Sequence, residues 1–333
     1  MTTDAPVTHR HLPDRLDNPL RSAVLSWESL LVLVVIGIFI INSLASPYFL
    51  NAWSLSDLTF NFTEKGLIAL AMALLIISGE IDLSVASIIA LASTTMGLAL
   101  QYGADTPTLV GIGVVVGVLC GAFNGALVTR LKLPSIVVTI GTMSLFRGIS
   151  YIILGDGSFK DYPKSFAWFG QGYVWWVISF ELVLFLAFAI GYFVLLHRTS
   201  FGRRVYAIGN NEVAAKFSGV RVERIKFILF CLTGLMSGIA AVLLTARLGS
   251  TRPSIAKGME LEAITMVVLG GVSILGGAGS ITGVVLAALI IGLVTFGLGL
   301  LNVPGTVMTI FTGALLIVVI ALPILFKMWR QRA

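Results

Sequence analysis

Long apolar runs without charge recur along the chain and alternate with short polar segments. A transmembrane helix needs about 20 predominantly apolar residues, and fewer where other helices surround it. Ten runs fit this description and predict ten transmembrane helices, at 27–46, 66–79, 83–101, 108–129, 135–154, 174–196, 225–246, 261–275, 281–300 and 303–325.

Two of these runs, the second and the eighth, are short, and glycines interrupt the chain at or near their ends. Broken segments are tolerated at membrane depth where the backbone is buried in protein or lines a pathway. A short apolar run, a Gly/Ser break and a run rich in small residues occur at 66–101, and the same order recurs at 261–300. Transporters are often built from internal repeats, and this repeated order of segments is compatible with an internal repeat.

The composition supports a membrane protein. Hydrophobic residues make up 57% of the 333 residues and charged residues 11%, with a mean hydropathy of +0.99. A soluble domain carries about 25% charged residues. Helices satisfy their own backbone hydrogen bonds in hydrocarbon, and the alternating segments of about ten residues that mark a barrel are missing from the sequence. The sequence predicts an all-α, polytopic membrane protein.

The basic residues predict the orientation of the spans. With the N-terminus inside, 15 of the 22 Lys and Arg residues fall in cytoplasmic segments, 6 fall in outside loops and Arg147 lies within a span. Positive charge is enriched in cytoplasmic loops, so both termini are expected in the cytoplasm. The chain then divides into a cytoplasmic tail at 1–26, a transmembrane domain at 27–325 and a cytoplasmic tail at 326–333.

This charge distribution also bears on partners. The net charge of +6 is explained by topology and by contact with lipid, and no nucleic-acid partner is expected. Both cysteines lie inside apolar runs, and the three histidines are too scattered to form a metal site. No cluster of His, Asp, Glu and a nucleophile indicates an enzyme.

Small residues predict one close helix contact. Gly113, Gly117, Gly121 and Gly125 are four residues apart and fall on one face of the fourth predicted helix. Such a face lets two helix backbones approach closely. Helix packing is therefore the favoured explanation for these glycines.

The stretch GEIDLSVAS (79–87) places two acids between apolar runs. Asp82 or Ser84 can cap the helix that follows, and Ser87 is a further polar side chain that can be structural or line a pathway. The predicted topology puts 79–82 in a tight cytoplasmic turn, where both acids reach water. Glu80 either pairs with a base on a neighbouring helix or a partner protein, or is a solvated turn residue.

Arg147 is the clearest charge within a predicted span. It can line a transport route or brace helices through an acid or carbonyl groups, and snorkelling is also open to it. We favour bracing.

The polar segment 197–226 is too hydrophilic to cross a membrane. Within it, NEVAAKFSG predicts a short helix capped by Asn211, with Glu212 in its first turn and Gly219 at its end. A helix presented on the cytoplasmic face is a docking element; the alternative is a basic loop held near anionic lipid.

This polar segment also resembles part of a known protein family. GRRVYAIGNNEVAAKFSGV (202–220) resembles the cytoplasmic coupling region of ABC importer permeases of the ribose/xylose/arabinose type, which reads close to G-R-x-x-x-A-I-G-G-N-x-x-A-A-x-x-S-G-I. Asn210 stands where glycine is usual. The matching positions are Gly202, Arg203, Ala207, Ile208, Gly209, Asn211, Ala214, Ala215, Ser218 and Gly219.

Two further motifs carry the resemblance. GEIDLSVAS resembles the family's G-G-I-D-L-S-V-G-S, with Glu80 and Ala86 in place of glycines. LEAITMVVLGGVSILGGAGSITGVVLAALIIG (261–292) resembles the glycine-rich block that the family carries in the same place. The three motifs occur in the family's order, and the similarity extends from about 27 to 325.

The resemblance implies a ten-helix importer fold in a bacterial inner membrane. It implies that two permease subunits, identical or paralogous, work with two cytoplasmic ATPase subunits and a periplasmic sugar-binding protein. The segment 197–224 would then be the coupling loop, with Gly202, Arg203, Gly209, Asn211, Glu212, Ala214, Ala215 and Gly219 as its ATPase-coupling residues. The sequence has no G-x-x-x-x-G-K-[ST] motif, so ATP and Mg are expected on the partner ATPase and no cofactor on this chain.

The resemblance leaves the substrate open. A deoxyhexose such as rhamnose is the preferred substrate, and autoinducer-2 and branched-chain amino acids are alternatives. A proton-coupled secondary transporter that uses Glu80, Asp82 or Arg147 is the remaining alternative from another class.

Overall fold

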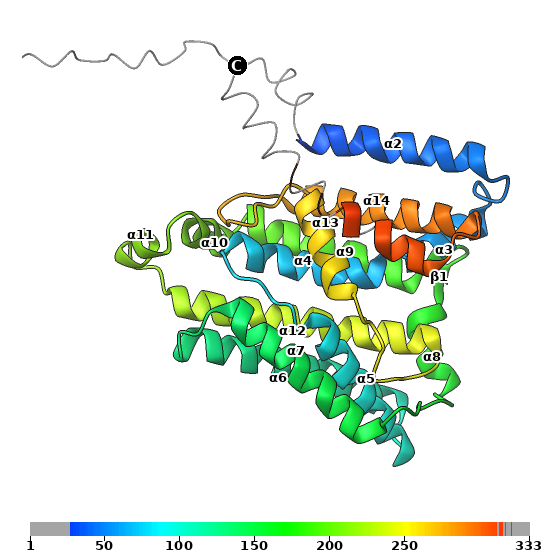
Figure 1. The fold of residues 1–333 in the computed structure, drawn as a ribbon, viewed down its shortest axis with the longest axis horizontal. Helices are drawn as coiled ribbons and strands as arrows, with labels where there is room; N and C mark the ends of the chain where they lie inside the picture. The colour runs from blue at the N-terminus through cyan, green and yellow to red at the C-terminus, as the bar shows by residue number, and fades with distance from the viewer. Residues whose placement is uncertain (1–26, 312, 316, 318–320, 322–333) are drawn as a thin grey trace, which may run out of the picture.

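The computed structural model describes residues 27–311, 313–315, 317 and 321. Its elements are α2 (Trp27–Ala45), α3 (Ala52–Phe60), α4 (Thr63–Ile77), α5 (Val85–Gln101), α6 (Thr106–Arg130), α7 (Ser135–Leu154), α8 (Lys164–Gln171), β1 (Tyr173–Trp175), β2 (Ile178–Ser179), α9 (Phe180–His197), α10 (Ser200–Asn210), α11 (Glu212–Phe217), α12 (Val222–Leu248), α13 (Met259–Leu269) and α14 (Ile281–Leu300), and another helix starts at Gly305. Figure 1 shows their arrangement.

The prediction of a helical membrane protein is confirmed, and each of the ten predicted spans overlaps a helix. Six helices in the described part are long and apolar enough to cross a membrane, or seven if α3 and α4 form one span bent by 45°. The remaining spans coincide with α5, α13 and the helix that starts at Gly305, which are shorter. The predicted tails at 1–26 and 326–333 lie outside the described residues.

One predicted boundary is wrong. The sixth span was placed at 174–196, but its helix, α9, begins at Phe180. The residues before it pair as the short antiparallel strands β1 and β2, and Trp175 and Trp176 are exposed there. Aromatic side chains raised the apparent hydrophobicity of a segment that turns at the surface.

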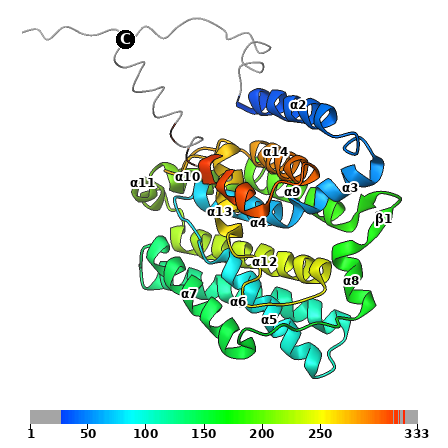
Figure 2. The same cartoon turned by 45° about the vertical axis from the view of Figure 1, so that its right-hand side comes forward.

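α4 lies at the centre of the protein. Its sequence is apolar on every face, which predicts a helix surrounded by others, and every residue of α4 except Lys65 is buried. α12 also lies inside, with α4, α9 and α14 on one side and α5, α6 and α7 on the other, while α2 covers α14 at the outer edge (Figures 1 and 2).

The predicted glycine contact is confirmed between α6 and α12. A Cβ on Gly117 would collide with the carbonyl of Gly234, and a Cβ on Gly121 would collide with the carbonyl of Phe230. A Cβ on Gly238 would come within 2.7 Å of the carbonyl of Gly113. The two backbones therefore touch, which only small residues permit.

The two predicted breaks also meet. One follows α4 at 78–84 and the other follows α13 at 270–280. Gly277 N donates a hydrogen bond of 2.9 Å to Ile77 O, so the second break satisfies a carbonyl at the end of α4. The repeated sequence pattern thus places its two interruptions side by side.

The loops gather at two opposite ends. The α11 end contains α10, α11 and the segments 79–84, 131–134 and 270–280. The β1 end contains α3, α8, the strands and the segment 249–258, where Phe159 and Thr251 pair through their backbones. These ends lie left and right in Figure 1. The segments predicted on one side of the membrane thus contact one another.

Enlarging Gly117 should break the α6–α12 contact. We expect Gly117→Leu to lower the free energy of unfolding by about 1–3 kcal/mol or more, because overpacking forces the backbones apart. Gly111→Leu is the matched control on the same helix, since no atom of the described residues lies within 4 Å of a Cβ there. Thermal unfolding in detergent measures both variants, and equal midpoints would contradict the prediction.

Candidate functional site

α10 is seated on both helix breaks. Thr199 caps it by accepting from the amides of Phe201 and Gly202. A Cβ on Gly209 would collide with Ile77 O and come within 2.5 Å of Gly277 N, so this position requires glycine.

Two polar side chains fix α10 to the second break. Tyr206 donates its hydroxyl proton to Gly279 O at 2.6 Å, and Asn210 Nδ2 donates to Gly277 O at 3.2 Å. Burial raises the pKa of Tyr206, which keeps it a neutral donor. Asn210, which replaces the family's usual glycine, thus has a role in holding the break.

α11 forms where the sequence predicts it. Asn211 Oδ1 accepts from Ala214 N at 2.9 Å, so Asn211 caps the helix. Gly219 follows the helix with φ +82°, a conformation that favours glycine. Its N–H donates to Lys216 O at 3.0 Å and helps close the last turn.

Sequence reasoning placed Ala214 and Ala215 among the coupling residues, but other side chains form most of the exposed apolar surface of α11. Ala215 is buried against the rest of the chain and Ala214 is exposed. The apolar side chains that α11 presents outward are Val213, 64% exposed, and Phe217, 89% exposed. They offer a hydrophobic contact for a partner at this end.

Gly202 and Arg203 lie at the start of α10. Gly202 is buried, and a Cβ there would collide with the carbonyl of Leu196 at the end of α9. Arg203 is exposed. Gly202 therefore sets the tight turn from α9 into α10, and Arg203 faces outward beside it.

Glu80 pairs with a base on a neighbouring helix. Lys226 Nζ, in the first turns of α12, lies 2.5 Å from Glu80 Oε1 and 2.7 Å from Glu212 Oε2. The Lys226 and Glu80 side chains are 10% and 13% exposed, while that of Glu212 is 54% exposed. One ammonium group thus joins α12, α11 and the α4–α5 break.

Asp82 is fully buried, so the prediction that it reaches water in a cytoplasmic turn is wrong. Ser84 donates to Asp82 Oδ1 through its amide at 2.8 Å and its hydroxyl at 2.6 Å. The reason is tertiary: Ser135 Oγ accepts from Ile81 N and Thr139 Oγ1 donates to Ile81 O, so α7 covers the segment.

The predicted capping by Asp82 is met only in part. Asp82 binds the amide of Ser84, the residue just before α5, and Ser84 makes no side-chain cap of its own. Asn124 Nδ2 on α6 donates to Ser84 Oγ at 2.8 Å, and Ser87 Oγ donates to Ser84 O at 2.7 Å. Asp82 Oδ2 and Asn124 Oδ1 are buried acceptors that find no hydrogen-bond partner among the described residues.

Arg147 braces the β1 end. Its Nη1 donates to Pro253 O and to Ile255 O, each at 2.7 Å. These bonds tie α7 to the segment 249–258. This is the bracing arrangement through carbonyl groups that sequence reasoning favoured.

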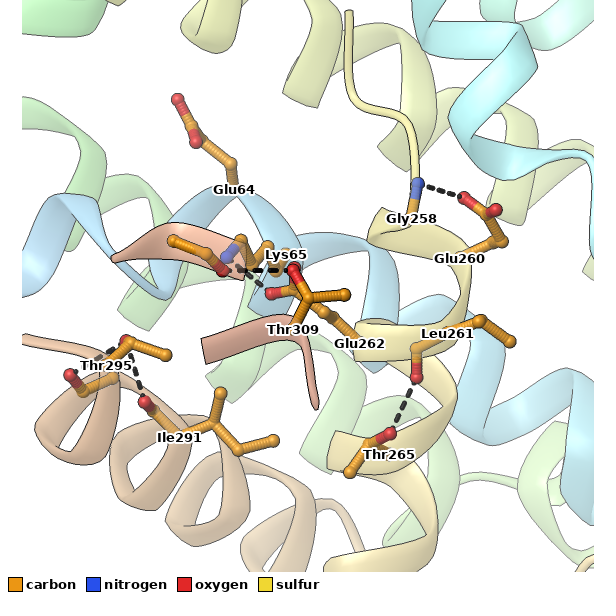
Figure 3. A network of polar contacts seen from close by, with 12 residues as sticks. Glu64, Lys65, Gly258, Glu260, Leu261, Glu262, Thr265, Ile291, Thr295 and Thr309 are labelled. Carbon is orange, nitrogen blue, oxygen red and sulfur yellow. Dashed lines mark hydrogen bonds and ion pairs between the residues drawn. The ribbon is translucent and has the colours of Figure 1, made fainter. Parts of the chain in front are cut away.

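Sequence reasoning missed a second set of ion pairs at the β1 end. Arg247 Nε and Nη2, at the end of α12, hold both oxygens of buried Glu64 on α4 at 2.9 and 2.7 Å. Lys65 pairs with Glu262 on α13. Figure 3 shows Glu64 and Lys65 pointing apart, with only Lys65 directed toward Glu262.

The structure therefore gathers most of the candidate residues at the α11 end. Glu80 and the coupling-loop residues meet there, Asp82, Ser84 and Ser87 lie just inside, and Arg147 is separate, at the β1 end. At the α11 end, the residues that sequence reasoning missed are Lys226 and Phe217. A signal for Lys226 existed, because it is the last base before the uncharged apolar run at 227–246. In the described part of the chain, no group of His, Cys, Asp and Glu could hold a metal ion.

Comparison with known proteins gives consistent matches. The family described as "Branched-chain amino acid transport system / permease component" matches residues 54–320. The ribose import permease protein RbsC of Bacillus subtilis is 37% identical over 292 residues, covering 86% of this chain and 90% of that protein. The autoinducer 2 import system permease protein LsrD of Salmonella typhimurium is 35% identical over 306 residues, covering 89% and 90%. No solved structure matches the chain.

We expect the buried cluster of Asp82 and Ser84 to stabilise the protein through the two hydrogen bonds that Asp82 Oδ1 accepts. Asp82→Ala leaves the Ser84 donors unsatisfied, and we expect the free energy of unfolding to fall by about 1–3 kcal/mol. Asp82→Asn retains an acceptor at Oδ1 and should remain within about 1 kcal/mol of the parent. Exposed Asp57 on α3 supplies the control, Asp57→Ala. Thermal unfolding in detergent tests all three, and equal loss in Asp82→Ala and Asp57→Ala would refute the assignment.

Proposed function

This chain belongs to the permease family described as branched-chain amino acid transport system / permease component, and we propose that it is the membrane subunit of an ATP-driven ABC importer for a monosaccharide. One observation carries the proposal. α10 rests on both helix breaks, and α11 beside it exposes Phe217 to a partner. A force applied to α11 therefore has a direct path to the interior of the membrane domain.

The partners follow from this role. Two ATPase subunits bind ATP and Mg and dock on α11. A sugar-binding protein docks at the β1 end, and a second permease chain, identical or paralogous, completes the membrane pathway. The chain itself binds no cofactor and catalyses no reaction.

The orientation follows from the same reasoning. The α11 end faces the cytoplasm and the β1 end faces the periplasm, with both termini of the chain in the cytoplasm of a bacterium. The basic residues of 197–226 support this orientation, since positive charge favours the cytoplasmic side.

Alternating access is the proposed mechanism. ATP binding closes the ATPases and displaces α11 together with α10. Because α10 contacts Ile77 and the segment 277–279, the displacement reaches both breaks, and the helices part toward the periplasm. Hydrolysis of ATP then returns the transporter to its starting conformation.

Relatives guide the choice of substrate. The Bacillus subtilis relative is named for ribose import, which supports a monosaccharide. We propose a deoxyhexose such as rhamnose as the first sugar to test. Autoinducer-2 is the second candidate, because several relatives are named as autoinducer 2 import permeases. Branched-chain amino acids are the third, from the description of the family.

Reconstitution in proteoliposomes tests the proposal. The permease, the ATPase encoded beside it and the matching binding protein are combined, with radiolabelled rhamnose, ribose, autoinducer-2 or leucine. We expect uptake that requires ATP and the binding protein. Uptake driven by a proton gradient without the ATPase would instead establish a secondary transporter and overturn the proposal.

Phe217 should anchor the ATPase. We expect Phe217→Glu to weaken copurification of the ATPase by about tenfold or more, because a central aromatic residue at an interface is worth about 2 kcal/mol or more. Tyr102→Glu is the control, since Tyr102 is 85% exposed and follows Gln101, which lines a pocket with Phe159 at the β1 end. Copurification from mild detergent with quantitative mass spectrometry measures both. Equal recovery in the two variants would contradict docking on α11.

A further inference from the structure

We infer that Lys226 is a positioning residue that latches the coupling helix α11 to the break between α4 and α5, so that displacement of α11 reaches the segment 79–84. The inference rests on the proposed function, because it assumes that a partner moves α11. It adds a residue outside the coupling motif and a route for the movement.

Lys226, Glu80 and Glu212 form a triad of charged side chains, and the geometry of this triad supports the inference. Lys226 Nζ contacts carboxylates from two different elements, Glu80 at 2.5 Å and Glu212 at 2.7 Å. The whole of Lys226 is only 8% exposed. Buried charges without partners are costly, so this ammonium group stays paired. α11 and the break are thus held to a single atom.

The two contacts differ in their surroundings. Glu80 is almost as buried as Lys226, whereas Glu212 is more than half exposed. An ion pair weakens as water surrounds it. The Glu80 contact is therefore the persistent one, and the Glu212 contact is the one that opens when α11 moves.

The break is built to transmit a change at Glu80. Glu80 follows Gly79, whose φ of +87° ends α4, and it precedes Asp82 by two residues. Ile81, between them, is bonded to α7 through Ser135 and Thr139. A shift of Glu80 therefore acts on the buried Asp82–Ser84 cluster through a short, non-helical segment.

A cavity lies beside the side chains of Lys226, Glu80 and Glu212. It has a volume of about 360 Å³ and lies between α6, α11 and α12. The residues of the triad line it, together with Lys132, Lys216 and Glu223. Water in this space can solvate Glu212 once it leaves Lys226, which lowers the cost of opening.

A second ion pair provides a matched control. Lys216 on α11 lies 2.7 Å from Glu223 on α12, but both side chains are exposed, at 60% and 47%. The hydrogen bond to Glu223 raises the pKa of Lys216 and keeps it charged. This pair joins the same two helices without reaching the break.

The residue at position 80 differs between this chain and the motif that it resembles. The motif that this sequence resembles has glycine where Glu80 stands, so a chain that follows it has no carboxylate for Lys226 at this position. Restoring the glycine, Glu80→Gly, removes the persistent contact.

The experiment uses the reconstituted transporter with its ATPase and binding protein. It measures ATP hydrolysis and uptake of the radiolabelled compound that the parent protein transports, and takes molecules imported per ATP as the coupling ratio. In Lys226→Met and Glu80→Gln we expect this ratio to fall by about tenfold while hydrolysis continues. Lys226→Arg and the control Glu223→Gln, which removes the exposed Lys216–Glu223 pair from the α12 side, should retain it within about twofold.

The outcomes separate the two claims. If the parent protein shows no ATP-driven uptake, the proposed function fails and the inference fails with it. If the parent protein transports and both triad variants keep its coupling ratio, the inference alone is overturned. Equal losses in the control Glu223→Gln and in Glu80→Gln overturn it as well. Should Lys226→Met fail to fold, as judged by its thermal unfolding, Glu80→Gln and Glu80→Gly decide the question.

Discussion

In a membrane, every backbone N–H and C=O needs a partner within the protein. This requirement is most demanding at the two helix breaks, where regular hydrogen bonding stops. Gly277 N satisfies Ile77 O, while Ser135 and Thr139 on α7 satisfy both backbone groups of Ile81. Asp82 satisfies the amide of Ser84. The interior of the protein is arranged around these few bonds, because without them the chain could not leave the helix at this depth.

The same requirement places the polar surface segment. α10 approaches the breaks so closely that Gly209 has no room for a side chain, and Tyr206 supplies a donor to Gly279 O. A surface helix thereby completes the hydrogen bonding of a partly buried break. The contact between α10 and the breaks therefore serves both stability and the transmission of movement. Displacing α10 would leave Gly279 O and Gly277 O without the donors that α10 supplies.

The apolar runs were sufficient to predict the helices, because burial in a membrane depends on local composition. They also indicated the glycine contact between α6 and α12, since four-residue spacing fixes a helix face. The burial of Asp82 was beyond this reasoning, because α6 and α7 supply its cover from positions such as 124, 135 and 139. The pairs Lys226–Glu80 and Arg247–Glu64 were also missed, since their partners lie 146 and 183 residues apart.

The first of these ion pairs joins α12 to the segment that follows α4, and the second joins α12 to the first turn of α4. α12 begins near Lys226 and ends near Arg247, while α4 begins near Glu64 and is followed by Glu80. The Arg247–Glu64 pair thus pins the two antiparallel helices together at the β1 end, and neither can slide along the other without separating a pair whose carboxylate is buried, which is costly. Movement that starts at α11 must then be taken up outside the pinned helices. The segment 79–84 meets that condition, because it contains Gly79 at φ +87° and its residues from 80 to 84 make no helical turn.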